Sequence, residues 1–306
     1  MQDYCTLALT AIFVAMSCTN QAVMEENAGP VNLNLDFGSD LAACMNSEDK
    51  TVRTSDDGKS YDLRYTVEVY RDLEEDVREN APCKRFVFTK TDIEELDHQI
   101  TMNIEDGDYE FYVWTDFVEK GTAADYFYNT ESLRKIALLG KHKGNNDFRD
   151  AFFGHEKMKV RHGGAGEDVV SCTVGMERAL AKCEFVTTDL KEFFGQLSGD
   201  IDYGNCKVMF YYTGRMPSVF DAVYDKPCAT RTGVEFSSPL AVDDEHDTSL
   251  GFDYVFTGEE ESEISFLVGL FDEHGRLLST TTHMSVPVKR NSVTKVDCQF
   301  IVPVTL

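Results

Sequence analysis

The residue best placed to take part in covalent chemistry is Cys18, which follows a short apolar run in the stretch AIFVAMSCTN. The run Leu7–Met16 is shorter than the roughly 20 residues that cross a bilayer as a helix, but it suits the apolar core of a signal peptide. Small residues at Ala15 and Ser17 would let a peptidase bind the chain, and the thiolate of Cys18 would then take up lipid. The sequence therefore predicts a lipoprotein signal over residues 1–17.

The residues on either side of this run bear on the same prediction. The preceding MQDY lacks the positive charge of a signal peptide, so an uncleaved anchor and a first core strand are the alternatives. The following TNQAVMEENAGP is polar, acidic and without periodicity, which is typical of a flexible tether. We expect this tether to span residues 18–30 and to be held at the outer membrane by the lipid on Cys18.

The other cysteines do not form a metal-binding pattern. If Cys5 leaves with the signal and Cys18 carries lipid, seven remain, and their spacing contains no CxxC pair. Cys183 and Cys298 occupy inward positions of strand-like runs, where cysteine acts as a small buried apolar residue. An odd number cannot all pair internally, and the sequence leaves open whether disulfides form and which cysteines pair.

Histidines, carboxylates and serines give no sign of catalysis. None of the seven histidines lies in an HExxH helix, and the acidic runs 243–247 and 259–263 lack the spacing of a calcium loop. There is no GxSxG motif, and GGAG (163–166) is not followed by the Lys-Ser of a phosphate loop. We expect no metal, no cofactor and no enzymatic activity. A secreted hydrolase is the last alternative, because catalytic residues on a β-sandwich can lie far apart in sequence.

Three aromatic residues could form a binding surface. Tyr112 and Trp114 lie on the side of a predicted strand opposite its apolar face, and Tyr128 follows in ADYFYNT. Exposed rings of this kind stack on sugars or bury themselves in a protein partner. The alternative is that a covering loop makes the three rings part of the core.

Alternation of apolar and polar residues predicts that strands carry these side chains. In YDLRYTVEVYR (61–71), one apolar face alternates with one solvated face. Strands are also expected at 31–37 and 84–90, a hairpin about Asp106-Gly107 within 98–117, and further strands or hairpins between 176 and 304. Two short helices are expected at 129–140 and 188–199, the second capped by Asp189.

Length and composition favour an all-β protein of two domains. The 306 residues exceed what one hydrophobic core usually serves, and many short strands with little helix indicate two β-sandwiches. The glycine cluster at 161–169 suggests a boundary there, so we expect sandwiches over 31–166 and 167–306. A net charge of −25 excludes nucleic acid as a partner, because phosphate contacts require a basic surface.

An ordered series of segments resembles the fimbrillin-like proteins of Bacteroidales, which are subunits, accessory proteins and anchors of lipoprotein-derived fimbriae. The series runs over nearly the whole chain and consists of DLRYTVEVYR, GDYEFYVWTDFVEKGTAADYFYNT, NNDFRDAFFG, ERALAKCEFVTTDL and VPVKRNSVTKVDCQF. The resemblance implies two tandem transthyretin-like β-sandwiches with a few short connecting helices. It also implies export as a surface-exposed lipoprotein or part of a fimbrium, with other fimbrial subunits or host and bacterial surface ligands as partners.

The resemblance further implies a way of assembly. In the polymerising members of that family, a protease removes the first strand after an arginine, and a strand of the next subunit takes its place. Here VNLNLDF (31–37) would be the removable strand and Arg53 the processing site. Because the sequence ends at FIVPVTL, directly after its last expected strand, a tip, anchor or accessory role is favoured over a shaft role. A surface lipoprotein that binds glycans through its aromatic residues is the alternative.

Overall fold

The computed structural model describes residues 28–38, 58–72, 81–91, 98–163, 169–197, 203–240 and 248–301. The expected lipidation site Cys18, the expected processing site Arg53 and residues 18–27 of the expected tether lie outside the described residues. The all-β fold class is confirmed, because strands in five sheets make up most of the described chain.

The first sandwich consists of a three-stranded sheet in the order β4-β1-β9 and a five-stranded sheet in the order β10-β8-β5-β2-β3. Strand β1 lies in the middle of the smaller sheet, antiparallel to β4 and parallel to β9. Its alternate residues Val31, Leu33 and Leu35 point into the core between the two sheets. The strands are β1 (Ala28–Asp36), β2 (Tyr61–Arg71), β3 (Lys84–Lys90), β4 (Gln99–Glu105), β5 (Gly107–Glu119), β8 (Phe152–Val160), β9 (Val170–Gly175) and β10 (Glu177–Arg178).

The second sandwich repeats this strand order. Strand β11 lies in the middle of the sheet β16-β11-β20, antiparallel to β16 and parallel to β20, as β1 lies between β4 and β9. The facing sheet has the order β15-β12-β17-β18, and β19 also pairs with β17. The elements are β11 (Leu180–Thr187), α2 (Leu190–Gln196), η3 (Tyr203–Asn205), β12 (Lys207–Tyr212), β15 (Glu235–Pro239), β16 (Thr248–Phe256), β17 (Ser262–Phe271), β18 (Leu277–Thr280), β19 (Met284–Val288) and β20 (Val293–Asp297).

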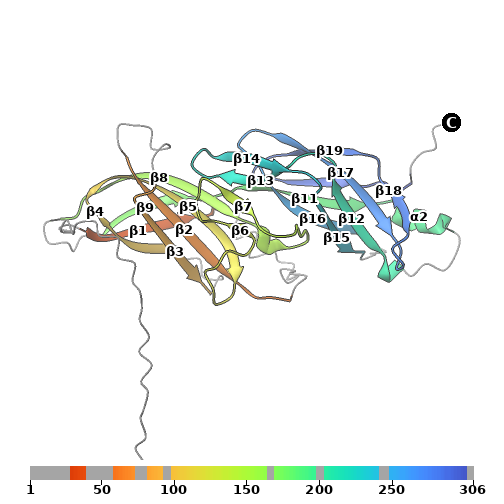
Figure 1. Ribbon diagram of the computed structural model, residues 1–306, viewed down its shortest axis with the longest axis horizontal. Coiled ribbons are helices and arrows are strands. Elements are labelled where there is room, and N and C mark those ends of the chain that lie inside the picture. The colour runs from red at the N-terminus through yellow and green to blue at the C-terminus, as the bar shows by residue number, and fades with distance from the viewer. Residues whose placement is uncertain are drawn as a thin grey trace, which may run out of the picture.

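An insertion from each sandwich contributes to a fifth sheet, which we call the cross-domain sheet. Its order is β14-β13-β7-β6, so strands from both halves of the sequence lie side by side in it. Figure 1 shows the two sandwiches in succession along the long axis, with this sheet where they meet. The inserted elements are β6 (Tyr128–Asn129), β7 (Ile136–Leu138), η2 (Asp147–Arg149), β13 (Met216–Asp221) and β14 (Lys226–Arg231).

The strands of the first sandwich continue beyond the glycine cluster at 161–169. Strand β9 pairs with β1, beginning at Val31 and Val170, and β10 pairs with β8. Both strands lie beyond residue 166 and belong to the sheets of the first sandwich. Since β11 begins at Leu180 and is the first strand of the second sandwich, we propose Ala179 as the boundary.

The prediction of a helix at 129–140 is wrong. This stretch contains β6, a turn and β7, and Leu133 and Ile136 are fully buried. Ile136 and Ala137 pair with β13, so hydrogen bonding to a distant strand outweighs the helical spacing of the sequence. The second expected helix is confirmed as α2. Asp189 lies at the N-cap position, but its side chain makes no hydrogen bond to the first turn of the helix. Its carboxylate instead accepts hydrogen bonds from Phe300 N and Ile301 N, each at 2.7 Å, and so fixes the last described residues.

The prediction of a hairpin about Asp106-Gly107 is also wrong, although a strand lies on each side of this turn. Strand β4 pairs with β1 and strand β5 pairs with β2 and β8, so the turn connects the two facing sheets of the sandwich. The Asp106 carboxylate accepts a hydrogen bond from His162 N at 2.8 Å, which holds the turn against the end of β8. A Cβ atom at Gly107 would lie 2.7 Å from the Tyr109 ring, so any other residue there would require this ring to move.

The face of β2 that was expected to be solvated is buried. Arg64 is 2% exposed and donates to both carboxylate oxygens of Asp116 at 2.7 and 2.8 Å. A third bond, 2.7 Å long, joins Arg64 to Asp125 of the inserted segment that covers this face. The larger sheet of the first sandwich therefore lies between the smaller sheet on one face and the insertion on the other. Charged side chains on the face beneath the insertion are paired with one another.

Candidate functional site at the junction of the two sandwiches

The three aromatic residues expected to form a binding surface lie in the core. Tyr112 is 4% exposed, and Trp114 and Tyr128 are fully buried. The Trp114 ring centroid lies 5.6 Å from that of Tyr128, 6.1 Å from Phe220 on β13 and 6.4 Å from Phe256 on β16. The expectation of a surface is wrong: Trp114 and Tyr128 pack against the second half of the chain, and Tyr112 packs between Tyr70 and His155 of the first sandwich.

The segment between β7 and η2 joins this aromatic cluster to the second sandwich. Asn145 N donates to Phe252 O at 2.9 Å, and Phe252 N donates to Asn145 Oδ1 at 2.7 Å, so the segment pairs with β16. Asn145 has a φ of 53°, a conformation that asparagine adopts more readily than most residues. A Cβ atom at Gly144 would lie 2.2 Å from the Phe236 ring, so a glycine allows this close approach.

A buried carboxylate lies where this segment meets the second sandwich. Asp253 on β16 is 1% exposed, and its oxygens accept hydrogen bonds from three side chains. The distances to Asp253 are 2.6 Å from His142 Nε2, 2.8 Å from Arg149 Nη1 and 2.5 Å from the Tyr212 hydroxyl. Arg231 on β14 extends this junction network, since its Nη2 lies 3.0 Å from His142 Nδ1. The network therefore joins the insertion of the first sandwich to three strands of the second half of the chain.

The hydrogen bonds define the state of His142. The Asp253 carboxylate can only accept, so its 2.6 Å contact places the hydrogen of His142 on Nε2, and Nδ1 then accepts from Arg231. Arg149 Nη1 also lies 3.2 Å from Nε2, but it makes its shorter bonds to Asp253 and to Lys143 O. Burial lowers the pKa of His142, and the nearby Arg149 lowers it further, which outweighs the effect of Asp253. Burial alone would raise the pKa of Asp253, but His142 and Arg149 hold it below its usual value. His142 is thus a neutral imidazole between a carboxylate and a guanidinium, with both ring nitrogens engaged.

Acid should weaken this junction through His142. The unfolded histidine has an ordinary pKa near 6.5 and the folded one a lower value, so the unfolded chain takes up the proton first as the pH falls. The free energy of unfolding should therefore fall as the pH drops below about 6.5. Denaturant unfolding at pH 7.5 and 5.5 should show a smaller pH effect in His142→Gln than in the wild type. Equal pH effects in the two proteins would contradict this assignment.

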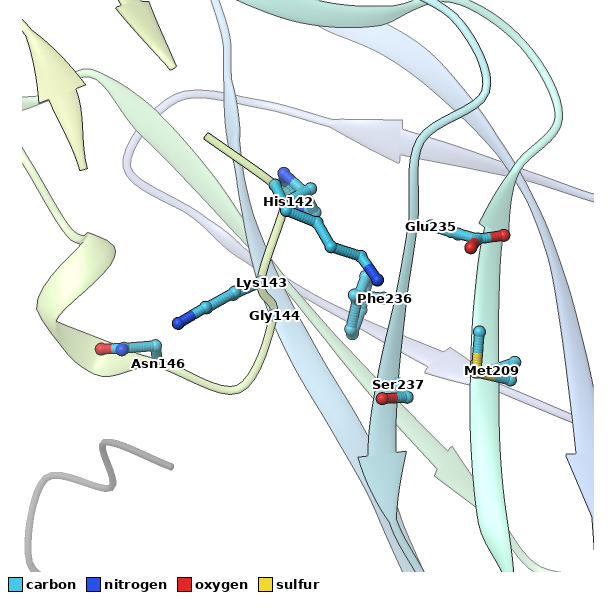
Figure 2. Close-up of a pocket in the computed structure, with 9 residues that line it drawn as sticks. His142, Lys143, Gly144, Asn146, Met209, Glu235, Phe236 and Ser237 are labelled. Atoms are coloured by element: carbon cyan, nitrogen blue, oxygen red, sulfur yellow. The ribbon is translucent and has the colours of Figure 1, made fainter. Parts of the chain in front are cut away.

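Two cavities lie on either side of the segment that carries His142. One, of about 300 Å³, is bounded by Lys143 and Asn146 on one side and by Met209, Glu235 and Phe236 on the other. Figure 2 shows these residues around the opening between the segment and β15. The second cavity, of about 220 Å³, is lined by rings and basic side chains, among them Tyr126 and Arg231. His142 lines both cavities, and each of its ring nitrogens has a hydrogen-bond partner.

No local pattern in the sequence predicts this junction. His142 and Asp253 are 111 positions apart, and Arg149 lies within the segment NNDFRDAFFG, which the family resemblance had marked only as a similarity. Within the described ranges, no group of three or more His, Cys, Asp or Glu residues could hold a metal ion. The site is therefore a set of hydrogen bonds and cavities that only the fold brings together.

No disulfide joins the cysteines in the described ranges. Cys183 and Cys298 are fully buried, as expected, and burial raises the pKa of each to about 12. These two thiols are therefore protonated and unreactive at neutral pH. The others are Cys83, Cys172, Cys206 and Cys228.

Comparison with known sequences gives one family. The model of a family of unknown function, DUF6562, matches residues 25–303. No curated protein matches the chain in sequence. Among the described helices, none is long and apolar enough to cross a membrane.

Several solved structures are similar to the chain at low identity. A candidate adhesin from Bacteroides ovatus is 10% identical, covers 94% of this chain and 98% of its own, and has a TM-score of 0.47. The fimbrial anchor protein Mfa2 from Porphyromonas gingivalis is 10% identical, with coverages of 83% and 82% and a TM-score of 0.42. A candidate polysaccharide-binding protein from Bacteroides thetaiotaomicron is 10% identical, with coverages of 82% and 79% and a TM-score of 0.46.

Proposed function

The chain belongs to the protein family DUF6562, and from this premise we propose that it is a cell-surface lipoprotein of fimbrial or adhesin type. In this proposal Cys18 carries the lipid, and the protein acts through its strand edges and surfaces without catalysis. Its partners are other fimbrial subunits or ligands on a cell surface. The ordered sequence resemblance to fimbrillin-like proteins supports the assignment, and the position of β1 supports the way of assembly.

The position of β1 is the observation that carries this proposal. The strand lies between β4 and β9, so its removal would leave two unpaired edges on either side of a groove. Arg53 lies between β1 and β2 in the sequence, so a cut there would separate β1 from the rest of the chain. An incoming strand could then pair with both edges, which is β-augmentation.

The side chains of β1 set the requirements for the incoming strand. Val31 and Leu33 are fully buried, Leu35 is 7% exposed, and Phe37 contacts the ring of Phe152 at a centroid distance of 5.3 Å. Burial of an aliphatic side chain stabilises by roughly 1.5 to 3 kcal/mol, so β1 should stay in place until another strand offers similar groups. A replacement strand needs apolar residues at every second position, in the register of Val31, Leu33 and Leu35.

The experiment uses the full chain and an arginine-specific protease under limiting conditions. We expect mass spectrometry to find a product that begins at Thr54. A fluorescent peptide with the sequence of residues 28–38 should then bind the cut chain, as measured by anisotropy, and should not bind the uncut chain. An Arg53→Gln variant treated in the same way should neither be cut at this position nor bind the peptide.

A second peptide tests whether binding depends on the apolar side chains of the peptide entering the core positions of β1. The same sequence with Leu33→Asp should bind at least tenfold more weakly, because a charge would enter the core position of Leu33. Equal binding of both peptides, or a cut chain that takes up neither, would contradict the proposal.

The alternative of glycan binding through Tyr112, Trp114 and Tyr128 does not hold for these residues. All three side chains are buried, so they offer no stacking platform to a sugar in solution.

A further inference from the structure

The cavity of about 220 Å³ at the junction has an unusual charge for this protein. The chain has 54 acidic and 29 basic residues, yet Lys141, Lys143, Arg149 and Arg231 line this cavity and no acidic residue does. The carboxylate behind it, Asp253, is bonded to Arg149 at 2.8 Å. Four cations and one carboxylate leave the cavity with a net positive charge in a strongly acidic molecule, so it should attract small anions.

Among the described residues, Arg231 is a partly buried cation of this cavity for which no ion-pair partner is found. Within the described residues its guanidinium donates to His142, which is neutral, and no carboxylate lies at ion-pair distance. Its Nε is buried and has no hydrogen-bond partner there. Burial, together with the charge of Arg149, lowers the pKa of Arg231, as expected for a cation whose charge is poorly compensated. An anion in the cavity would supply the compensation that the protein does not.

The lysines and the cavity wall indicate what kind of anion fits. Lys141 and Lys143 are exposed at the cavity and flank the buried His142, so they can meet a ligand that arrives from solvent. Tyr126 and Phe127 form part of the wall, with their ring centroids 4.6 Å apart in an edge-to-face arrangement. Aromatic rings beside cations suit a ligand that carries both an apolar ring face and a negative charge.

We propose that this cavity binds the carboxylate of an acidic sugar, with Arg231 as the main cation and the two lysines as the entrance. A cavity of about 220 Å³ accommodates a single sugar unit, which could be the end or a branch of a longer glycan. Arg149 is held by Asp253 and serves to keep the cavity in shape. Because the segments that line the cavity come from both insertions, a bound sugar would also stabilise the junction.

Calorimetry on the full chain tests this proposal, with sodium glucuronate, glucose and sodium sulfate as probes at one ionic strength. We expect one glucuronate to bind per chain, no binding of glucose, and at least tenfold weaker binding of sulfate. Arg231→Met should weaken glucuronate binding at least tenfold. Since Arg231 also contacts His142, the double variant Lys141→Gln, Lys143→Gln provides an independent test on exposed residues and should weaken binding at least threefold.

The matched control removes the same charge elsewhere. Lys159 and Lys289 are exposed on the sandwiches and do not line the cavity, so Lys159→Gln with Lys289→Gln should bind glucuronate as the wild type does. Equal affinity for sulfate and glucuronate would overturn the assignment of a sugar acid, and a lack of glucuronate binding would overturn the site. Either failure leaves the proposal about β1 intact, because that proposal rests on a different part of the molecule.

Discussion

Replacing Trp114 with alanine should lower the free energy of unfolding by about 3 to 5 kcal/mol, the usual cost of deleting a large buried aromatic side chain. Trp114 is fully buried, and its ring lies among Tyr128, Phe220 and Phe256. These rings come from β6, β13 and β16, so the cavity would open where the two sandwiches meet. Chemical denaturation followed by circular dichroism measures the loss.

The control for this substitution is an exposed aromatic residue in the turn between β13 and β14 of the cross-domain sheet. Tyr224 is 43% exposed, so Tyr224→Ala should cost less than about 1 kcal/mol. The chain has a single tryptophan, so the fluorescence of the wild type reports on Trp114 alone. We expect acrylamide to quench this fluorescence weakly until the protein unfolds. Strong quenching in the folded protein, or a loss from Trp114→Ala as small as that from Tyr224→Ala, would place the ring at the surface.

Replacing Asp253 with alanine should be about as severe, with an expected loss of about 3 to 5 kcal/mol. The substitution leaves the Arg149 guanidinium buried without its carboxylate, and it removes the acceptor for His142 and Tyr212. Burial of an unpaired charge costs far more than the pair itself contributes, because the desolvation penalty is no longer offset. Equilibrium unfolding in guanidinium chloride at pH 7.5 measures the effect.

Two further variants separate charge from hydrogen bonding. Asp253→Asn keeps an acceptor oxygen but loses the charge, so its stability should fall between those of the wild type and Asp253→Ala. Glu273 lies in the exposed turn between β17 and β18, and Glu273→Gln should have an effect below about 0.5 kcal/mol. An Asp253→Ala variant as stable as Glu273→Gln would show that the network does not hold the sandwiches together.

Strand positions could be predicted from the sequence because the period-two pattern depends on local chemistry. The expected strands at 31–37, 61–71 and 84–90 correspond to β1, β2 and β3. What covers each face of a strand depends on distant segments, and here the pattern was misleading. Arg64 and Glu68 alternate with apolar residues as solvent-facing side chains do, but both are buried. The inserted segment supplies one partner for each, Asp125 for Arg64 and Leu133 N for Glu68.

The same reason explains the aromatic residues and the turn. Tyr112 and Trp114 lie on the covered face of β5, and rings on a covered face look in the sequence like rings on an exposed one. The Asp106-Gly107 turn has the composition of a hairpin turn, but pairing of β4 with β1 carries the chain into the other sheet. In both cases the local sequence is compatible with two structures, and contacts with distant segments of the chain determine which one forms.

The junction could not be predicted, because the residues of its network are far apart in the sequence and follow no recognisable motif. His142 belongs to the insertion of the first sandwich, Arg231 to that of the second, and Asp253 to β16. Each insertion interrupts a repeated strand order, which becomes visible only when the sheets are compared. The charge pattern of the cavity is equally hidden, since the overall composition of the chain is acidic.

The most direct test of the central proposal is the N-terminus of the mature protein, isolated from the outer-membrane fraction of its native cells. Mass spectrometry of the N-terminal peptide should find a chain that begins at Cys18 and carries acyl chains on that residue. Chains recovered from assembled fibres should begin at Thr54 instead. A protein that retains residues 1–17 and carries no lipid would contradict the assignment of a surface lipoprotein.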